Sequence, residues 1–496
     1  MSSGVGPNMR SRNVAWMQVA AAETAAARPA VLDGEAVVTH AELRDRALGI
    51  ASALAEAGVR PGDRVALLMR RGADAAAAYF GALACGAVAV IVNESLRPRQ
   101  IEYVLSHSGA VALVAEPEIT GRLPRPLEIV ARAIDPAELP GAADFAPVSR
   151  DERDLAQIVY TSGSTGQPKG VMLSHGNLWA GAEVVTDYLR ISGEDRIAAL
   201  LPFSFDYGLN QLWCSTAKAA TLVVDRSPIA ARIVRTLRER EVTVLACVPP
   251  LWLQLLQVEA FCSAPLPALR VMTNTGGHLP VEAVSKLRAC QPHADLVLMY
   301  GLTEAFRSTR LPPERVDEKP GSIGHAIPGA EVLVVREDGS ECAPGEAGQL
   351  VHRGPTVALG YWNDQEASER VYRDGAVYSG DLVKRDEDGH LFFVGREDTL
   401  IKTLGYRVRP DEVAEVLYAS GQVAEALVSS EPDRERGARV VAHVVLAAGG
   451  ELGRLQEFAA RELPRYMQPS KVEVHDHLPR TASGKHDTLA TTRGPR

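Results

Sequence analysis

Short apolar runs alternate with segments of helical spacing along the chain as far as about residue 300. A capping box at Thr39 and Glu42 predicts that a helix begins there, and the turn at residues 58–62 ends it near Ala57. The apolar runs predict buried strands at residues 64–69, 88–92, 111–115, 221–224, 242–248, 271–272 and 296–299. This order of strand, helix and strand predicts a parallel sheet covered by helices.

The pattern changes at about residue 328, where short strands separated by turns follow one another. Residues 331–335, 348–352 and 391–394 predict these strands, and Gly339 and Gly389 lie in the turns. The predicted fold is therefore α/β, with a large N-terminal domain of parallel-rich sheets flanked by helices. That domain spans residues 1–397 and includes a β subdomain at about 328–397. A small, mobile α+β C-terminal domain spans residues 398–496.

Length and charge narrow the class of protein. A chain of 496 residues is too long for one ordinary core, which predicts at least two domains. The net charge of −9, without a basic run, argues against nucleic acid as a main partner. No apolar stretch reaches the ~18 residues that a membrane helix needs. The six cysteines are scattered without a CxxC or Cys/His cluster, so we expect reduced thiols, no disulfide framework, no zinc site and a cytoplasmic location.

Residues 160–170 read Tyr-Thr-Ser-Gly-Ser-Thr-Gly-Gln-Pro-Lys-Gly, a loop of small residues between two apolar runs. Bare backbone N–H groups, hydroxyls and the cation of Lys169 are what a polyphosphate needs. Pro168 separates Lys169 from Gly166, so the loop is not a Walker A motif. By composition alone, a flexible hairpin loop fits equally well.

The order of these residues closely resembles the signature loop of the adenylate-forming superfamily, which includes acyl-CoA synthetases, peptide-synthetase adenylation domains and firefly luciferase. The resemblance continues through further motifs over nearly the whole chain. It implies ATP and Mg²⁺ as cofactors. In this loop it implies ATP binding by Thr161, Ser162, Gly163, Ser164, Thr165, Gly166 and Lys169.

Two more motifs lie at strand ends, where open α/β sheets bind ligands. Residues 299–305, Met-Tyr-Gly-Leu-Thr-Glu-Ala, resemble the superfamily's Tyr-Gly-x-Thr-Glu motif. The resemblance implies that Tyr300 lies against adenine, Thr303 contacts the α-phosphate and Glu304 holds Mg²⁺, for which one carboxylate beside phosphate oxygens suffices. Residues 273–277, Thr-Asn-Thr-Gly-Gly, resemble the loop under the adenine, which assigns ATP binding to Gly276 and Gly277 as well.

Three charged positions near these motifs depart from the family pattern or have no assigned role in it. His278 stands where the family usually has Glu or a small residue, and we expect a surface or core histidine. Arg307 and Arg310 could bind a second substrate carboxylate, but a surface role is the preferred interpretation.

Motifs in the last third complete the resemblance. Residues 378–381, Tyr-Ser-Gly-Asp, imply that Asp381 accepts hydrogen bonds from the ribose hydroxyls. Residues 395–398, Gly-Arg-Glu-Asp, resemble the hinge motif, with Arg396 on ribose or phosphate and Asp398 as the pivot. Arg407 is a second cation near the phosphates. By themselves these charges would be interpreted as a solvated turn surface.

Residues 479–485, Pro-Arg-Thr-Ala-Ser-Gly-Lys, resemble the C-terminal motif whose lysine bridges the substrate carboxylate and the α-phosphate. The resemblance thus implies four catalytic residues, which are Thr303, Glu304, Arg407 and Lys485. The implied reaction has two halves. A carboxylate first displaces pyrophosphate from ATP, and a thiol then displaces AMP while the small domain reorients.

Residues 201–208 correspond to the segment that lines the acyl pocket in the superfamily. Phe205 and Asp206 resemble amino-acid adenylation domains, in which the aspartate pairs with the substrate ammonium. With Asn210 they are the predicted substrate-binding residues. The alternative is that Asp206 only caps a helix opening at Tyr207.

The chain's resemblance is closest to stand-alone amino-acid adenylation enzymes and, over residues 200–361, to acyl-CoA ligases associated with exopolysaccharide and exosortase gene clusters. We therefore predict an ATP-dependent, AMP-forming ligase. We expect it to adenylate a carboxylic acid, with an amino acid as the favoured interpretation, and to transfer this acid to the phosphopantetheine thiol of a separate carrier protein. The alternative is an acyl-CoA synthetase for a small or medium-chain acid, with CoA as acceptor. Because Glu304, Asp381 and Lys485 are all present, a regulator without catalytic chemistry is disfavoured.

Overall fold

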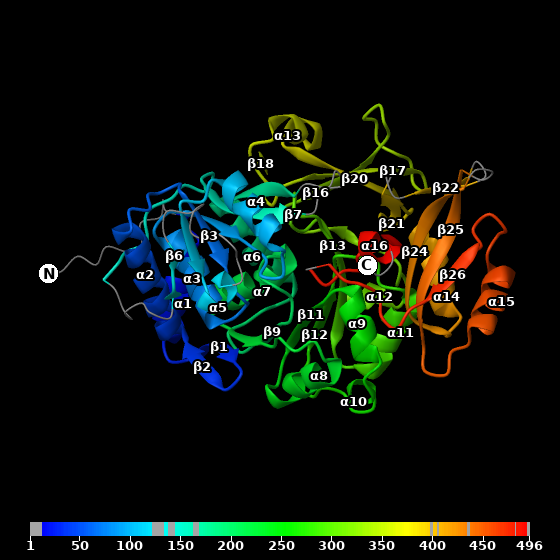
Figure 1. Ribbon diagram of the computed structural model, residues 1–496, viewed down its shortest axis with the longest axis horizontal. Helices are drawn as coiled ribbons and strands as arrows, with labels where there is room; N and C mark the ends of the chain where they lie inside the picture. Colours follow the sequence, from blue (N-terminus) through cyan, green and yellow to red (C-terminus); the bar gives the residue numbers. More distant parts are fainter. Residues whose placement is uncertain are drawn as a thin grey trace.

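A computed structural model describes residues 12–121, 133–136, 144–161, 168–396, 400–403, 406–433, 437–481 and 483–493. Two large, mostly parallel sheets form its N-terminal part (Figure 1). The first has nine strands in the order β15-β14-β13-β12-β11-β9-β10-β1-β2, and the second has seven in the order β18-β8-β7-β4-β3-β5-β6. The predicted α/β class is confirmed.

The strands of both sheets follow the apolar runs of the sequence. The nine-stranded sheet contains β1 (Pro29–Asp33), β2 (Ala36–Thr39), β9 (Arg196–Ala199), β10 (Thr221–Val224), β11 (Val244–Cys247), β12 (Val271–Asn274), β13 (Asp295–Tyr300), β14 (Thr309–Leu311) and β15 (His325–Ala326). The seven-stranded sheet contains β3 (Arg64–Leu68), β4 (Val88–Ile91), β5 (Ala112–Ala115), β6 (Ala133–Ile134), β7 (Leu155–Thr161), β8 (Lys169–Ser174) and β18 (Gly360–Tyr361).

Helices cover these sheets. In α2 (His40–Glu56) the local sequence determines where the helix begins. The Thr39 side chain accepts from the Glu42 backbone N–H, and the Glu42 carboxylate accepts from the Thr39 N–H, so the predicted capping box is present. The other helices are α1 (Ala15–Ala25), α3 (Ala73–Ala84), α4 (Pro98–Ser108), α5 (Pro117–Thr120), α6 (His175–Tyr188), α7 (Asp206–Ala217), α8 (Ala230–Glu239), α9 (Pro249–Leu256), α10 (Glu259–Cys262), α11 (Val281–Cys290), α12 (Pro313–Val316) and α13 (Gln365–Val371).

One buried chain of hydrogen bonds joins the helical layer to the seven-stranded sheet. The indole N–H of Trp213 on α7 donates to the Tyr79 hydroxyl on α3 at 3.0 Å. That hydroxyl donates in turn to the Gln157 side chain on β7 at 2.8 Å. Because buried polar groups need partners, this relay fixes how the two helices lie against the strand.

The predicted β subdomain is a five-stranded antiparallel sheet, formed by β16 (Glu331–Val335), β17 (Ala347–Arg353), β19 (Tyr372–Arg373), β20 (Ala376–Arg385) and β21 (Leu391–Arg396). Most of the α+β part that follows lies at the opposite end of the molecule from α1 and α2, and its last helix returns towards the middle (Figure 1). It comprises β22 (Ile401–Thr403), β23 (Tyr406–Val408), α14 (Pro410–Ala419), β24 (Val423–Asp433), β25 (Gly437–Leu446), α15 (Leu452–Glu462), β26 (Lys471–Val474) and α16 (Thr488–Arg493). The predicted domain boundary at 397/398 falls outside the described residues and stays a prediction.

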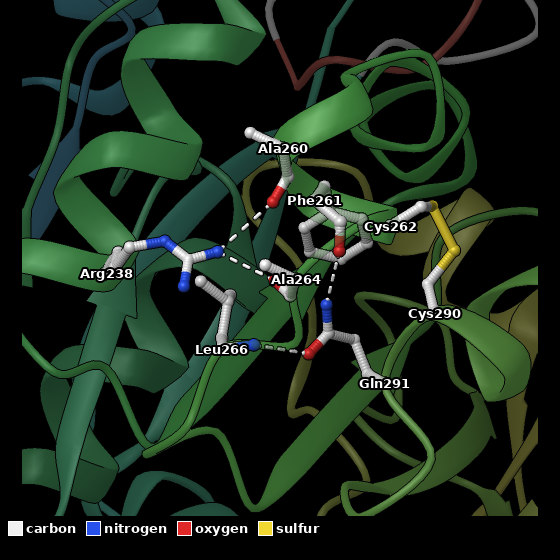
Figure 2. Close-up of a disulfide and its surroundings, with 8 residues drawn as sticks. All are labelled: Arg238, Ala260, Phe261, Cys262, Ala264, Leu266, Cys290 and Gln291. Atoms are coloured by element: carbon white, nitrogen blue, oxygen red, sulfur yellow. Dashed lines mark hydrogen bonds between the residues drawn. A yellow bond between two sulfur atoms is a disulfide. The ribbon is translucent and has the colours of Figure 1, made fainter.

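The expectation that all cysteines are reduced is wrong for one pair. Cys262 at the end of α10 and Cys290 at the end of α11 form a disulfide (Figure 2). Beside it, the Gln291 side chain donates to the Phe261 carbonyl and accepts from the Leu266 backbone N–H. Twenty-eight residues separate the two cysteines in sequence, so only the packing of α10 near α11 brings them together.

Removing this disulfide should lower stability measurably. A cross-link that closes a loop of 28 residues stabilises a chain by about 3–4 kcal/mol in the chain-entropy account. Cys262→Ser should therefore unfold at a lower temperature than the wild type under non-reducing conditions, and Cys342→Ser, at a free cysteine, is the matched control. Six titratable thiols in denatured, unreduced protein instead of four would show that the bond does not form.

No helix within the described ranges is both long enough and apolar enough to cross a membrane.

Candidate active site

A small cavity lies at the carboxyl ends of β12 and β13, where three distant parts of the chain converge. The start of α7, the loops after the two strands and the C-terminal loop that carries Lys485 all contribute to its wall. The lining residues are Phe205, Asp206, Thr275, Gly276, Gly301, Leu302, Thr303, Phe306, Arg307 and Lys485. Strand ends of this kind are where open α/β sheets bind ligands, as predicted from the motifs.

Lys485 enters this cavity from the C-terminal α+β part. Its ammonium lies 5.2 Å from the centroid of the Phe205 ring, and a Cβ at Gly276 would lie 3.0 Å from its Cε. Gly276 also has φ +81°, so a side chain there would be strained and would crowd the lysine. Burial lowers the pKa of Lys485 below its usual range, although nearby carboxylates, first among them Asp206, act in the opposite direction.

The loop that carries Lys485 is held at its base by one carboxylate. Glu425 on β24 pairs with Arg480 at 3.0 Å and with the Nε2 of His486 at 3.0 Å. The Thr481 backbone N–H donates to the Lys485 carbonyl at 2.7 Å, which closes the loop. Lys485 therefore lies between two residues, Arg480 and His486, that are held by the same carboxylate.

Three predicted nucleotide residues from separate motifs meet at Asp381. The Tyr300 hydroxyl donates to one carboxylate oxygen of Asp381, and the Arg396 guanidinium lies 2.9 Å from the other. The residue after Tyr300 is Gly301, where a Cβ would lie 2.3 Å from the Phe306 carbonyl oxygen. The tight turn after β13 thus requires glycine.

Glu304 is held by an aromatic residue that the sequence analysis did not select. The Tyr361 hydroxyl donates to Oε1 of Glu304 at 2.7 Å, and the Lys169 ammonium lies 5.0 Å from the centroid of the Tyr361 ring. Within the described residues, Oε2 of Glu304 has no hydrogen-bond partner. Tyr361 therefore connects the end of the signature loop to the loop after β13. No local sequence pattern predicted this role for Tyr361.

The remaining signature-loop positions are only partly placed. Thr161, at the end of β7, pairs with Lys169 of β8 in an antiparallel register. Residues 162–167 lie outside the described residues. The predicted ATP contacts of Ser162, Gly163, Ser164, Thr165 and Gly166 therefore stay predictions. Asp398 and the side chain of Arg407 lie outside them too.

Asp206 is the first residue of α7, whereas the alternative interpretation made it the cap of a helix opening at Tyr207. Phe205 occupies the N-cap position without a side-chain cap bond, and the helix itself begins at Asp206. The Oδ1 of Asp206 accepts from the Tyr207 backbone N–H at 2.7 Å. Only 7% exposed, its carboxylate lines the cavity together with Lys485.

Asn210 is not brought to this cavity. It lines a neighbouring small cavity together with Tyr207, Cys214 and other residues of α6, α7, β12 and β13. Asn210 is buried, and its Nδ2 has no partner among the described residues. The predicted substrate-binding trio therefore divides, with Phe205 and Asp206 on one cavity and Asn210 on the other.

The expected surface role of Arg307 is wrong. Its side chain lies over the rings of Tyr207 and Phe306, and the residue is 2% exposed. Two guanidinium nitrogens, Nε and Nη2, lack a partner among the described residues. Arg310 is partly buried and lies over the Tyr188 ring. The turn after Glu304 carries Arg307 inward, and the residues around it in sequence gave no sign of this.

His278 is exposed, as the surface interpretation expected, and its side chain also contacts the C-terminal part. Its Nε2 is 2.9 Å from the carboxylate of Glu415 on α14. The other Glu415 oxygen accepts from the backbone N–H of Val281, the first residue of α11, at 2.8 Å. Burial lowers the pKa of His278, but the hydrogen bond and charge of Glu415 outweigh this and raise its pKa overall.

This contact should depend on pH. Because the pKa of His278 is raised in the folded protein, its contact with Glu415 stabilises the fold fully below the ordinary histidine pKa of about 6.5. This stabilisation is lost as the pH rises through the raised pKa. His278→Gln should therefore lower the melting temperature more at pH 6 than at pH 8.5. Glu415→Gln should produce the same pattern, and the double variant should add little to either. A melting difference independent of pH would contradict this.

Comparison with known proteins places the site in context. Residues 17–362 match the family described as AMP-binding enzyme, and residues 412–485 match the AMP-binding enzyme C-terminal domain. The chain is 32% identical to an L-proline–[L-prolyl-carrier protein] ligase of Pseudomonas fluorescens, over 94% of this chain and 95% of the relative.

Two solved structures of o-succinylbenzoate CoA synthetase from Bacillus subtilis are similar throughout. The complex with the acyl-adenylate intermediate has a TM-score of 0.85 and 30% identity, over 95% of this chain and 96% of that one. The complex with ATP and a magnesium ion has a TM-score of 0.85 and 29% identity, over 96% of this chain and 99% of that one.

Proposed function

Because this chain belongs to the family of AMP-binding enzymes and is an AMP-forming ligase, we propose that it activates an amino acid and transfers it to the phosphopantetheine thiol of a carrier protein. The observation that carries the proposal is the buried carboxylate of Asp206 beside Lys485 in one cavity. An amino acid has one charge of each sign, and this cavity has a counter-charge for each.

The contacts of Asp206 support this pairing. One carboxylate oxygen accepts the Tyr207 backbone N–H, and within the described residues the other has no hydrogen-bond partner. A buried ammonium without a partner costs several kcal/mol, so an amino acid would need such a carboxylate. The 32% identity to a ligase that acts on proline and a prolyl-carrier protein supports the same substrate class and acceptor.

ATP would lie across the cavity and the residues around Asp381. In this proposal Asp381 accepts from the ribose hydroxyls, Tyr300 lies against adenine, and Arg396 and Lys169 face the phosphates. Mg²⁺ fits at Glu304, because Tyr361 fixes one carboxylate oxygen and leaves the other without a partner in the described chain. When bound, Mg²⁺ neutralises phosphate charge, and it needs few protein ligands.

The protein's own groups then act by position and charge. Lys485 holds the substrate carboxylate next to the α-phosphate, and Thr303 contacts that phosphate from the opposite loop. A carboxylate oxygen forms a bond to the α-phosphorus, and the bond to pyrophosphate breaks. In the second half the thiol releases its proton to solvent, its sulfur bonds to the carbonyl carbon, and the bond from that carbon to AMP breaks. Holding two anions together is the main contribution, since no covalent protein intermediate is required.

A second candidate function is synthesis of an acyl-CoA from a carboxylic acid that carries a further anionic group. It is favoured by Arg307, which lines the same cavity with two nitrogens that lack a partner among the described residues. A buried guanidinium is stabilised by a carboxylate that reaches it.

ATP–pyrophosphate exchange over a panel of amino acids and simple carboxylic acids separates the two. In the proposed function Asp206→Ala lowers exchange with amino acids by more than about 30-fold, because the ammonium loses its partner (about 2 kcal/mol). Exchange with simple acids of similar size should be unaffected or improved. Asp364→Ala is the matched control, since Asp364 caps α13 away from the cavity. Equal losses across the panel would overturn the amino-acid proposal.

A further inference from the structure

Outside the active site, three potential metal ligands converge on the C-terminal three-stranded sheet. β25 and β26 are parallel neighbours, and their register places His443 directly opposite Glu473. His475 follows β26 immediately, and its backbone N–H continues the ladder to the Val444 carbonyl at 2.8 Å. Residues two apart on an extended strand face the same side, so Glu473 and His475 both lie on the face that His443 occupies.

The three ligand atoms form a compact triangle. The Nδ1 of His443 is 2.9 Å from Oε2 of Glu473 and 3.3 Å from Nε2 of His475. The third side, from Nε2 of His475 to Oε2 of Glu473, is 3.8 Å. A tetrahedral zinc ion with bonds of about 2.0–2.1 Å places its ligand atoms about 3.3–3.4 Å apart. One of the three observed distances is shorter than this value and one is longer, so small shifts of the side chains would bring all three atoms to bonding distance from one ion.

Neighbouring groups orient these ligands as the outer partners of a metal site do. The other ring nitrogen of His443, Nε2, lies 2.9 Å from the Ser429 hydroxyl, which fixes the plane of the ring. The ammonium of Lys471 contacts Oε1 of Glu473, and Oε2 is the atom that faces the histidines. His443 is 2% exposed, so its position is set by packing rather than by solvent.

A second cluster of the same residue types shows the contrast. Asp386, Asp388 and His390 also lie close together, but the ammonium of Lys319 contacts both carboxylates, at 2.5 and 2.7 Å. A protein cation already occupies the centre of that cluster. In the first cluster, no cationic side chain of the described residues contacts both histidines and the facing glutamate oxygen.

We propose that His443, Glu473 and His475 bind one zinc ion, with a fourth position open to water. Two imidazoles and one carboxylate are ligands that zinc accepts, whereas calcium and magnesium prefer oxygen alone. The site shares no residue with the cavity around Lys485. It joins β25 to the end of β26, from which the chain continues to the loop that carries Lys485, so a bound ion would restrain the base of that segment.

Titration of the full-length, chelator-treated protein with Zn²⁺ tests this, with free zinc followed by a chromophoric chelator. We expect one zinc ion per chain at micromolar or lower concentration, and a weakening of at least about tenfold in His475→Asn and in Glu473→Gln. Zinc should also raise the melting temperature of the wild type but not of these variants. Asp388→Asn, in the second cluster, is the matched control and should bind as the wild type does.

Cobalt substitution gives a second readout that folding defects do not mimic. Co²⁺ in a tetrahedral site with nitrogen ligands absorbs visible light strongly, and this absorption should be lost in His475→Asn while the variant keeps its circular dichroism. Wild-type protein that binds no zinc, or binds it equally in all variants, would overturn the proposal. Neither result would affect the proposed amino-acid substrate, which the exchange panel tests separately.

Discussion

Lys485→Ala should lower the rate of adenylate formation by about 100- to 1,000-fold, the range seen when one pre-positioned charge partner is removed from a reacting centre. The reason is that the ammonium of Lys485 lines the cavity with Asp206 and Thr303, and in the proposed function this ammonium holds two anions together. Pyrophosphate exchange measures this half-reaction directly.

The second half-reaction should respond differently. Thiolation from supplied acyl-adenylate joins a thiol to a neutral carbonyl, so Lys485→Ala should leave its rate largely unchanged. Lys286→Ala, which removes a surface lysine paired with Glu282 on α11, controls for the loss of a positive charge. A loss of equal size in both halves would count against a role confined to adenylation.

Asp381→Asn should raise the KM for ATP by about 10- to 100-fold, with a smaller effect on kcat. Hydrogen bonds to a charged group contribute about 1.5–3 kcal/mol each, and the amide keeps the shape of the side chain while it loses the charge. Asp381 also receives the Tyr300 hydroxyl and pairs with Arg396, so the substitution loosens three proposed nucleotide residues together.

Kinetics at varied ATP and saturating acid give this KM. Asp338→Asn is a suitable control, because Asp338 is an exposed acid in a turn of the same β subdomain. An unchanged KM for ATP in Asp381→Asn would remove this carboxylate from the nucleotide site.

Features that depend on neighbours in sequence could be predicted from the sequence alone. The capping box at Thr39 and Glu42 fixes the start of α2, because both partners lie within one helical turn. The apolar runs predicted the parallel strands, since a strand buried on both faces needs nearly continuous apolar residues. The motif around Glu304 could be placed at a strand end, because it directly follows the apolar run at residues 296–299.

Only the tertiary structure decided which distant residues meet. Arg307 looked like a surface residue and is buried over Tyr207, because the turn after Glu304 directs it inward. The contact of His278 with Glu415 joins positions 137 residues apart. The same is true of the disulfide and of the cluster around His443, each of which depends on how separate elements pack. Local sequence determines helix ends, strands and turns through short-range sterics and hydrogen bonds. Contacts between elements follow instead from the burial of whole faces, which no local pattern encodes.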